Sequence, residues 1–283
     1  MSDFTFRDEV AVVTGAGGML CSVIAKELAG RGCRLALLGR SAGKLQPVAD
    51  EIQAAGGTAL VISTDVNEVD QVEAACARVE SELGACRFLV NGAGGNQAVA
   101  CTSTMEYDER ELSDDKPEDM RGFFNLDIDA VDSVIKTNTT GTILPSQVFG
   151  REMARLGRGN ILNFASMTSY RPFTRVPAYA AAKAGVINFT QWLSVYLAPA
   201  GIRVNAVAPG FFVNDRSRKI LMNPDGSLSL RGENVMAHTP QKAFGQARDL
   251  LGCVCWLLND DEAKFVTGIT VPVDGGFLAS AGV

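Results

Sequence analysis

One tyrosine and one lysine in this chain have the spacing that proton transfer requires. Tyr179 and Lys183 are four residues apart in the run YAAAKAG, so both should project from one face of a helix. A free phenol titrates at about pH 10, and a neighbouring ammonium stabilises the phenolate and lowers that pKa. We therefore expect Tyr179 to donate or accept a proton at a substrate oxygen, with Lys183 lowering its pKa.

Ser166 precedes Tyr179 at a position where a hydroxyl could hold the same oxygen. It ends the apolar run NILNFAS, thirteen residues before Tyr179. If that run is a strand of a parallel sheet, Ser166 lies at the carboxyl edge, where such sheets bind ligands. We expect Ser166 to polarise a substrate carbonyl.

Two glycine-rich turns predict a dinucleotide site. The turn TGAGGMLC (14–21) opens an Ala/Leu-rich helix, whose backbone N–H groups could hold a pyrophosphate, although a plain tight turn is the competing interpretation. The turn NGAGG (91–95) should end the fourth strand, where small residues let a ligand approach. From these turns we predict cofactor contacts by Gly15, Gly17, Gly18, Met19, Leu20, Asn91, Gly92, Ala93 and Gly94.

Two further positions bear on which cofactor binds. Arg40 follows the second apolar run, where a carboxylate would otherwise meet the adenine ribose hydroxyl. A guanidinium there favours a 2′-phosphate, hence NADP(H) over NAD(H), with NAD(H) still possible; a solvated surface arginine is the alternative. Asp65 ends the third run, where its carboxylate could reach an adenine amino group or cap the next helix.

Short apolar runs alternate with helix-length segments along the sequence. The runs lie at 9–14, 33–38, 58–64, 87–91, 160–166, 202–208 and 268–273, and helices are expected to about 31, to about 55, and over about 67–83, 130–155, 178–197 and 246–259. This alternation predicts one α/β domain over 1–283, a three-layer, doubly wound, Rossmann-type parallel sheet of about seven strands. An acidic insertion near 105–128 and a mixed segment near 211–245 interrupt the pattern.

Composition argues against several kinds of protein. His238 is the only histidine, so a Ser-His-Asp or Cys-His site has one candidate base and a multi-histidine metal site has none. The seven cysteines are scattered and no export signal precedes them, which argues against a disulfide framework. Cys253-x-Cys255 lies in an apolar helical pattern without a second ligand pair, so we interpret it as core and predict no metal site.

Charge and hydropathy argue against nucleic-acid and membrane partners. The net charge is −6, and residues 106–132 hold eleven acidic against three basic residues, as an acidic surface insertion would. The rest of the chain is not basic enough for nucleic acid. The uncharged stretch 88–105 is broken by polar residues and is too polar to span a membrane. With no apolar leader at the N-terminus, we expect a cytoplasmic protein.

These motifs together resemble the short-chain dehydrogenase/reductase family over nearly the whole sequence. The matching residues are Thr14-Gly15, Asp65-Val66, Asn91-Gly92-Ala93-Gly94, Asn138, Ser166, Tyr179 with Lys183, and Asn205-Ala-Val-Ala-Pro209-Gly210. The resemblance implies strand order 3-2-1-4-5-6-7, hydride transfer between a nicotinamide and a CH–OH group, and a tetrad of Asn138, Ser166, Tyr179 and Lys183. It further implies that Lys183 binds the nicotinamide ribose, that Asn138 supports a proton-relay water, and that Val66, Pro209, Gly210 and Phe212 also contact the cofactor.

Two places in the sequence differ from the family pattern. The usual turn, Thr-Gly-x-x-x-Gly-x-Gly, has glycines where this sequence has Met19 and Cys21, so the pyrophosphate contacts are expected to differ. A threonine that often follows Pro-Gly near the cofactor amide is replaced by Asn214, which could make the same hydrogen bond.

A narrower resemblance suggests the substrate. The sequence is similar to the D-mannonate oxidoreductases of this family, also called fructuronate reductases, in the segments 92–97, 125–149, 209–212, 237–240 and 271–283. Those enzymes interconvert D-fructuronate and D-mannonate. This implies a polar sugar-acid substrate. A gluconate-type sugar acid, a 3-oxoacyl thioester, and a non-catalytic dinucleotide-binding protein on the same fold remain as alternatives.

A sugar acid needs a cation for its carboxylate, and arginine suits a bidentate grip. Arg171 and Arg175 lie between Ser166 and Tyr179, while Arg218, Arg231 and His238 lie in the 211–245 segment, where this family has its substrate lid. Taken alone, each is more often a solvated surface residue. We expect Arg171, Arg175 or Arg218 to bind the carboxylate and Asn96 to contact hydroxyls.

The resemblance also predicts assembly. The helices expected from about Ala130 and Ala178 are those through which the family forms dimers, and its members are commonly homotetramers. The C-terminal GGFLASAGV (275–283) is apolar and rich in small residues, as expected of a tail that tucks into a neighbouring subunit.

Overall fold

Seven parallel strands form one sheet in the order β3-β2-β1-β4-β5-β6-β7, which confirms the predicted order. The protein is described here from a computed structural model, which covers residues 6–213 and 215–280. The strands are β1 (Val10–Thr14), β2 (Arg34–Gly39), β3 (Thr58–Ser63), β4 (Cys86–Asn91), β5 (Gly159–Phe164), β6 (Ile202–Pro209) and β7 (Thr270–Val273). In the parallel register, Thr14 pairs with both Leu38 and Asn91, so the ends of the central strands form one edge.

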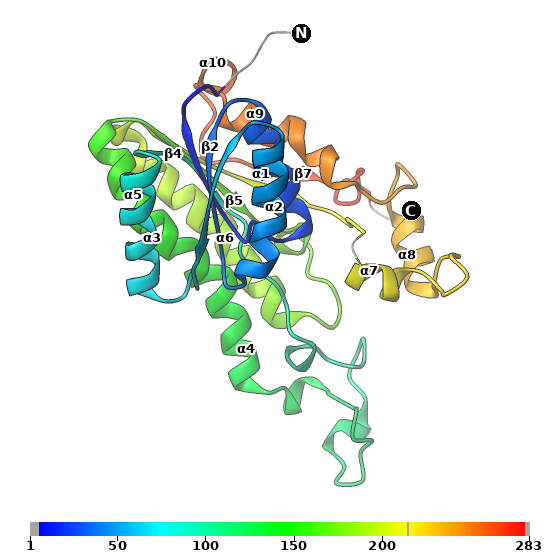
Figure 1. The fold of residues 1–283 in the computed structure, drawn as a ribbon. Helices are drawn as coiled ribbons and strands as arrows, with labels where there is room; N and C mark the ends of the chain where they lie inside the picture. The colour runs from blue at the N-terminus through cyan, green and yellow to red at the C-terminus, as the bar shows by residue number, and fades with distance from the viewer. Residues whose placement is uncertain (1–5, 214, 281–283) are drawn as a thin grey trace.

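Helices cover both faces of this sheet, as Figure 1 shows. One face carries α1 (Met19–Gly30), α2 (Ala42–Ala54) and α9 (Leu251–Leu258), and the other carries α3 (Val69–Glu82), α5 (Gly141–Leu156) and α6 (Pro177–Leu197). Strand side chains alternate between the two cores: Ala11 and Val13 pack with the first group of helices, and Val10 and Val12 with the second. This burial on both sides explains why the strands read as continuous apolar runs, and the three-layer prediction is confirmed.

The helix predicted over about 130–155 is interrupted, so that prediction was wrong in detail. The structure has α4 (Ile128–Ile135), a π-helical turn (Lys136–Thr140), and then α5. The side chain of Asn138 donates to the Val134 carbonyl at 2.8 Å and to the Gly95 carbonyl at 2.6 Å. These bonds accompany the wider turn, which places Asn138 inside the protein rather than on a helix surface.

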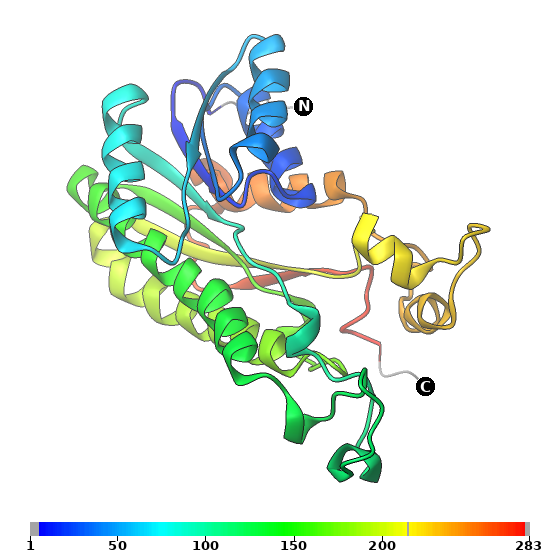
Figure 2. The same ribbon diagram turned by 60° about the horizontal axis from the view of Figure 1, so that its bottom comes forward.

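Two segments extend from the carboxyl edge of the sheet (Figure 2). A short 3₁₀ turn at Ala98–Ala100 precedes the acidic insertion, which contains two more at Glu109–Leu112 and Phe123–Asn125. The lid segment 211–245 contains α7 (Asp215–Leu221) and α8 (Leu230–His238). A 3₁₀ turn (Ala247–Leu250) precedes α9, and α10 (Asp260–Ala263) follows it. Within the described ranges, no helix is both long and apolar enough to cross a membrane.

Candidate active site

Ser166, Tyr179 and Lys183 come together at the carboxyl edge of β5. Ser166 follows that strand by two residues and is 7% exposed. Proline at the first position of α6 fits the start of a helix, and the helix then carries Tyr179 in its first turn and Lys183 one turn later. The Lys183 Nζ donates to the Phe164 carbonyl at 2.6 Å, which ties α6 to the end of β5.

The electrostatics of the site differ from the expectation in one respect. Burial raises the pKa of Tyr179, and a hydrogen bond with the Ser166 hydroxyl lowers it. Burial also lowers the pKa of Lys183 to about 8. Burial is the larger effect, so the Tyr179 pKa is raised overall, and Ser166 is the group that opposes this rise. Lys183 Nζ lies 5.9 Å from the tyrosine ring centroid and donates to a backbone carbonyl.

Asn138 lies beside this group and is fully buried. Besides donating to Val134 and Gly95, its Oδ1 accepts from the Gly95 N–H at 3.1 Å. Asn138 therefore fixes the glycine turn after β4 against the π-helical turn.

Eleven of the seventeen predicted cofactor residues line a cavity of about 330 Å³, which Ser166, Tyr179 and Lys183 also line. Gly94 lies close to its base, because a Cβ there would be 2.6 Å from Asn138 Oδ1 and 3.3 Å from Lys183 Nζ. Gly15 has a left-handed φ of 65°, and its Cβ would be 2.8 Å from the Gly92 carbonyl. The lining residues are Gly15, Gly18, Met19, Leu20, Cys21, Gly92, Gly94, Gly95, Phe164, Ala165, Ser166, Tyr179, Lys183, Pro209, Gly210 and Phe212.

A nicotinamide cofactor fits this cavity. A Cβ at Gly15 would overlap the backbone of Gly92, so glycine lets the two turns approach each other and leave their backbone facing the cavity. The 12-residue helix α1 begins at it, and its N-cap Gly18 makes no side-chain capping bond, which leaves backbone N–H groups for a pyrophosphate. Met19 and Leu20 open that helix and line the same cavity.

Cys21 explains how the unusual glycine pattern is accommodated. A Cβ on Gly92 would overlap the Cys21 Sγ, so the cysteine fills the space that glycine leaves at position 92. Burial raises the pKa of Cys21 to about 12, so a neutral thiol lines the cavity. Sequence reasoning noted Cys21 as a departure but did not connect it with Gly92.

Several predicted cofactor residues lie away from the cavity lining. Gly17 faces α2, since its Cβ would be 2.9 Å from Lys44 Cβ, so the predicted contact for Gly17 is not supported. Asn91 is buried and donates to Ser146 and Asn163, which makes it part of the sheet edge. The Ala93 N–H donates to the Thr14 hydroxyl at 3.1 Å, as does that of Gly92, which joins the two glycine turns.

The residues proposed for the adenine end are placed along the first strands. Arg40 is exposed just after β2. The Asp65 carboxylate accepts from the Asn67 N–H at 2.9 Å, whereas the N-cap of α3 is Glu68, so Asp65 forms a turn instead of capping the helix. Val66 is buried beside Gly141, whose Cβ would be 2.7 Å from the valine methyl group.

Two of the three arginines predicted to bind a carboxylate are engaged elsewhere. Arg171 donates to the Ser280 carbonyl at 2.8 Å, and Arg175 donates to the Thr102 carbonyl at 3.0 Å. Arg175 also has a left-handed φ of 74°, a conformation that is uncommon for a bulky side chain. Arg218 is exposed on α7, and its guanidinium lies 3.6 Å from the Met222 sulfur, a weak acceptor.

The remaining substrate candidates lie outside the lining of the catalytic cavity. Asn96 directs its amide to the Cys101 sulfur at 3.2 Å. His238 ends α8, with Nδ1 2.7 Å from the Asn234 carbonyl, and Arg231 is half-buried in the same helix. Asn214 lies outside the described residues.

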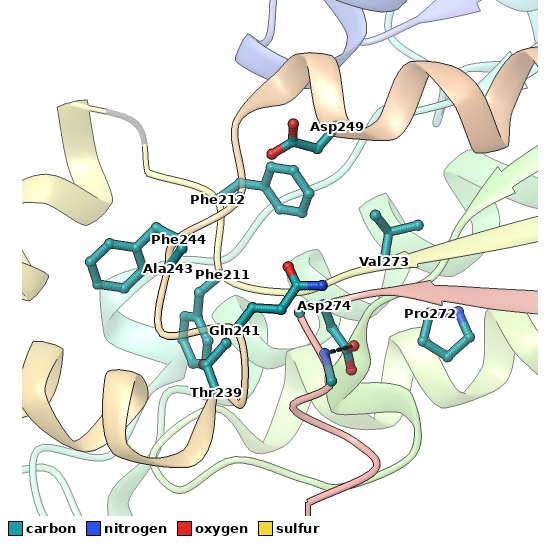
Figure 3. A pocket seen from close by; sticks show the side chains of 13 residues that line it. Phe211, Phe212, Thr239, Gln241, Ala243, Phe244, Asp249, Pro272, Val273 and Asp274 are labelled. Atoms are coloured by element: carbon teal, nitrogen blue, oxygen red, sulfur yellow. Dashed lines mark hydrogen bonds between the residues drawn. The ribbon is translucent and has the colours of Figure 1, made fainter.

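A second cavity, of about 460 Å³, lies behind Phe212 between the lid and the end of β7 (Figure 3). The Gln241 side chain projects into it, and Asp249 and Asp274 contribute carboxylates. Its lining includes no arginine or lysine, so it does not suit an anionic group. Sequence reasoning missed this cavity because its walls come from three separate segments.

Comparisons with known proteins show the family of this chain. The family model for short chain dehydrogenases matches residues 9–224. The uncharacterized oxidoreductase UxuB of Bacillus subtilis (strain 168) is 45% identical over 275 residues, which cover 97% of this chain and 96% of that protein.

Two solved structures are similar over nearly their whole length. A proposed D-mannonate oxidoreductase from Haemophilus influenzae, with bound NAD, is 38% identical with a TM-score of 0.93, and 99% of each protein is covered. A gluconate 5-dehydrogenase from Burkholderia cenocepacia J2315, in complex with NADP and tartrate, is 25% identical with a TM-score of 0.84, covering 99% of this protein and 98% of that one. The chain therefore belongs to the short-chain dehydrogenase family, oxidoreductases that act on CH–OH groups with a nicotinamide cofactor.

Proposed function

We propose that this protein interconverts a sugar-acid ketone and its alcohol, with D-fructuronate and D-mannonate as the expected pair. The observation that carries the chemistry is the group of buried Ser166, half-buried Tyr179 and buried Lys183, which line one cavity with the two glycine turns. The sugar-acid assignment is supported by similarity to the proposed D-mannonate oxidoreductase and to the gluconate 5-dehydrogenase with bound tartrate.

In this proposal each side chain has a separate task. A bound nicotinamide supplies or accepts the hydride. Tyr179 gives a proton to the carbonyl oxygen during reduction, and burial keeps its hydroxyl protonated because it raises the pKa. Ser166 holds the same oxygen. Lys183, fixed to the Phe164 carbonyl, binds the nicotinamide ribose, and Asn138 holds the Gly95 turn and supports the proton-relay water.

The cofactor preference proposed here is NADPH. It rests on Arg40, which is exposed at the end of β2 where no carboxylate precedes it. The similar structures include one with NAD and one with NADP, and NAD(H) is the alternative.

A second candidate substrate class is an apolar carbonyl compound such as a 3-oxoacyl thioester. A cavity of about 660 Å³ between the insertion and the loop before α6 has largely apolar walls, among them Tyr107, Phe123, Phe124 and Phe173. An acyl group would suit such walls better than a polyhydroxylated one.

A panel assay separates these substrates. Uronates, aldonates, gluconate-type acids and a 3-oxoacyl thioester are offered with NADPH and NADH, and the absorbance of the reduced nicotinamide is followed. We expect the highest kcat/KM for a uronate with NADPH. Preference for the thioester would replace the sugar-acid proposal, and nucleotide binding without turnover of any carbonyl would favour a non-catalytic role.

The proposed assembly is a homotetramer. On α6, Trp192, Val195 and Tyr196 are 57%, 77% and 67% exposed, and the Trp192 and Tyr196 rings stack at 5.1 Å, which supports an interface on this helix. The C-terminal segment contacts Arg171 and Phe173 of its own subunit, and its tuck into a neighbour stays a prediction; 281–283 lie outside the described residues. A monomer by light scattering at micromolar concentration would overturn the tetramer.

A further inference from the structure

Three phenylalanine rings from distant parts of the sequence meet at the mouth of the active site. Phe173 and Phe211 stack with centroids 5.4 Å apart and planes 3° apart. Phe277 packs edge-on against both, at 5.6 Å from Phe173 and 5.5 Å from Phe211. All three are half-buried, so the cluster closes a surface instead of filling the core.

Each ring belongs to a segment that forms or adjoins the catalytic cavity. Phe173 lies in the loop between Ser166 and Tyr179, and Phe211 follows Gly210, which lines that cavity. The segment that carries Phe277 begins at Asp274, and a Cβ on Gly210 would be only 2.6 Å from the Asp274 Cα. The three rings therefore join the catalytic loop, the start of the lid and the C-terminal segment.

Other contacts hold the C-terminal segment in this place. The Asp274 carboxylate accepts from the N–H groups of Gly276 and Leu278 at 2.9 and 2.8 Å, which folds the segment on itself. Further on, Arg171 of the catalytic loop donates to the Ser280 carbonyl at 2.8 Å. In Figure 2 this segment, in red, runs between the lid and the insertion.

We infer that Phe277 is a positioning residue for the substrate, because its ring joins the loop between Ser166 and Tyr179 to the lid at Phe211. With the ring in place, the two walls of the mouth keep one spacing in front of the catalytic hydroxyls. Without it, the loop and the lid must be brought together by the substrate, which weakens binding. The inference rests on the proposed active site but not on which carbonyl compound is the substrate.

The test compares Phe277→Ala with Phe277→Tyr, which keeps the ring, and with Phe265→Ala. Phe265 is fully exposed near the amino end of β7, at the opposite edge of the sheet, so this control removes an equal ring far from the mouth. kcat and KM are measured with the carbonyl compound that the wild type reduces best, and the Kd values for NADPH and NADH by fluorescence titration. For Phe277→Ala we expect KM to rise about tenfold, with kcat within about twofold and the Kd unchanged. Phe277→Tyr and Phe265→Ala should resemble the wild type.

Hydrogen exchange over 170–177 and 211–213 gives a readout that needs no turnover. In Phe277→Ala both segments should exchange faster, and adding Phe173→Ala should raise KM little further because the two rings act as one unit. The inference would be overturned by an unchanged KM or by unchanged hydrogen exchange. It would also be overturned if kcat and cofactor affinity fell together with the rise in KM. If sugar acids fail but another carbonyl is reduced, the sugar-acid proposal falls and this test proceeds with that compound. If no carbonyl is reduced, exchange alone decides it.

Discussion

The catalytic edge of the sheet and the two segments that flank it are built on different principles. At the edge, Ser166 and Lys183 are 7% and 4% exposed, and their polar atoms bond to nearby backbone. In the insertion and the lid, large apolar side chains face solvent, such as Phe123 at 69% and Leu230 at 77%. The edge is thus constrained by the core beneath it, whereas the flanking segments are not.

This contrast separates reaction chemistry from substrate choice. A buried polar group needs a partner within the protein, so a change at the edge removes a hydrogen bond that nothing replaces. An exposed side chain in a flanking segment can change without unfolding the protein. Substitutions at the edge should therefore lower kcat, and those in the flanking segments should mainly shift KM.

The largest expected effect is that of Tyr179→Phe, a substitution at the carboxyl edge of the sheet. The ring stays in place and only the transferable proton is lost, so kcat should fall about a thousandfold, equivalent to roughly 4 kcal/mol in the barrier. Cofactor Kd, measured by fluorescence titration, should not change. Survival of more than about a tenth of kcat would mean that Tyr179 is not the acid.

The second expected effect is on the pH dependence of stability, and it tests the burial of Lys183 at this edge. Burial lowers the Lys183 pKa from 10.5 to about 8, so below pH 8 the folded state carries a desolvated charge that destabilises it. Between pH 8 and 10.5 the folded state releases that proton while the unfolded state keeps it, so stability should rise with pH relative to Lys183→Met. The change is roughly 3 kcal/mol, since one pKa unit is about 1.4 kcal/mol.

Urea unfolding of both proteins across this pH range gives the measurement. Lys44→Met, a loss of an exposed lysine, serves as the matched control. A constant difference in the free energy of unfolding between wild type and Lys183→Met would contradict the burial argument.

The sequence predicted the edge far better than the flanking segments, for a physical reason. Local sequence patterns indicate where strands and helices end, and the glycine turns, Ser166 and the Tyr179–Lys183 pair lie at such ends. The parallel register then brings those ends together. Arg171 and Arg175 instead take their partners from 109 and 73 residues away. No local pattern encodes such tertiary contacts. An arginine that can bind a substrate and an arginine that bonds to a distant backbone carbonyl therefore cannot be distinguished from the sequence.

The same limit applies to backbone details at the edge. The π-helical turn at Lys136–Thr140 occurs with bonds between Asn138 and Gly95, 43 residues away, so helical periodicity alone predicted one unbroken helix. Gly17 was expected to contact the cofactor because it lies in the first glycine-rich turn (14–21). In the structure, a Cβ at Gly17 would be 2.9 Å from the Lys44 Cβ, so the glycine lets α2 approach this turn.

The third expected effect concerns Arg40 and the preference between NADPH and NADH. If Arg40 meets a 2′-phosphate, Arg40→Ala should raise KM for NADPH about thirtyfold and leave NADH nearly unchanged, because only the former carries that charge. Steady-state kinetics with both cofactors measures this. Equal losses for NADPH and NADH, or a wild type that prefers NADH, would remove Arg40 from the site.

The smallest and most specific effect concerns the lid. Arg171 and Arg175 already donate to backbone carbonyls, whereas Arg218 is exposed and faces only the weak acceptor Met222 among the described residues, which makes it the preferred partner for a substrate carboxylate. Arg218→Met should raise KM for a uronate about tenfold and leave a neutral ketone of similar size unchanged, because only the uronate loses an ion pair. Arg171→Met is the matched control: it should raise KM for both compounds alike, since it loosens the C-terminal segment. If Arg218→Met, Arg171→Met and Arg175→Met all keep the wild-type KM for every acidic compound tested, the carboxylate assignment fails, and with it much of the case that this lid selects a sugar acid.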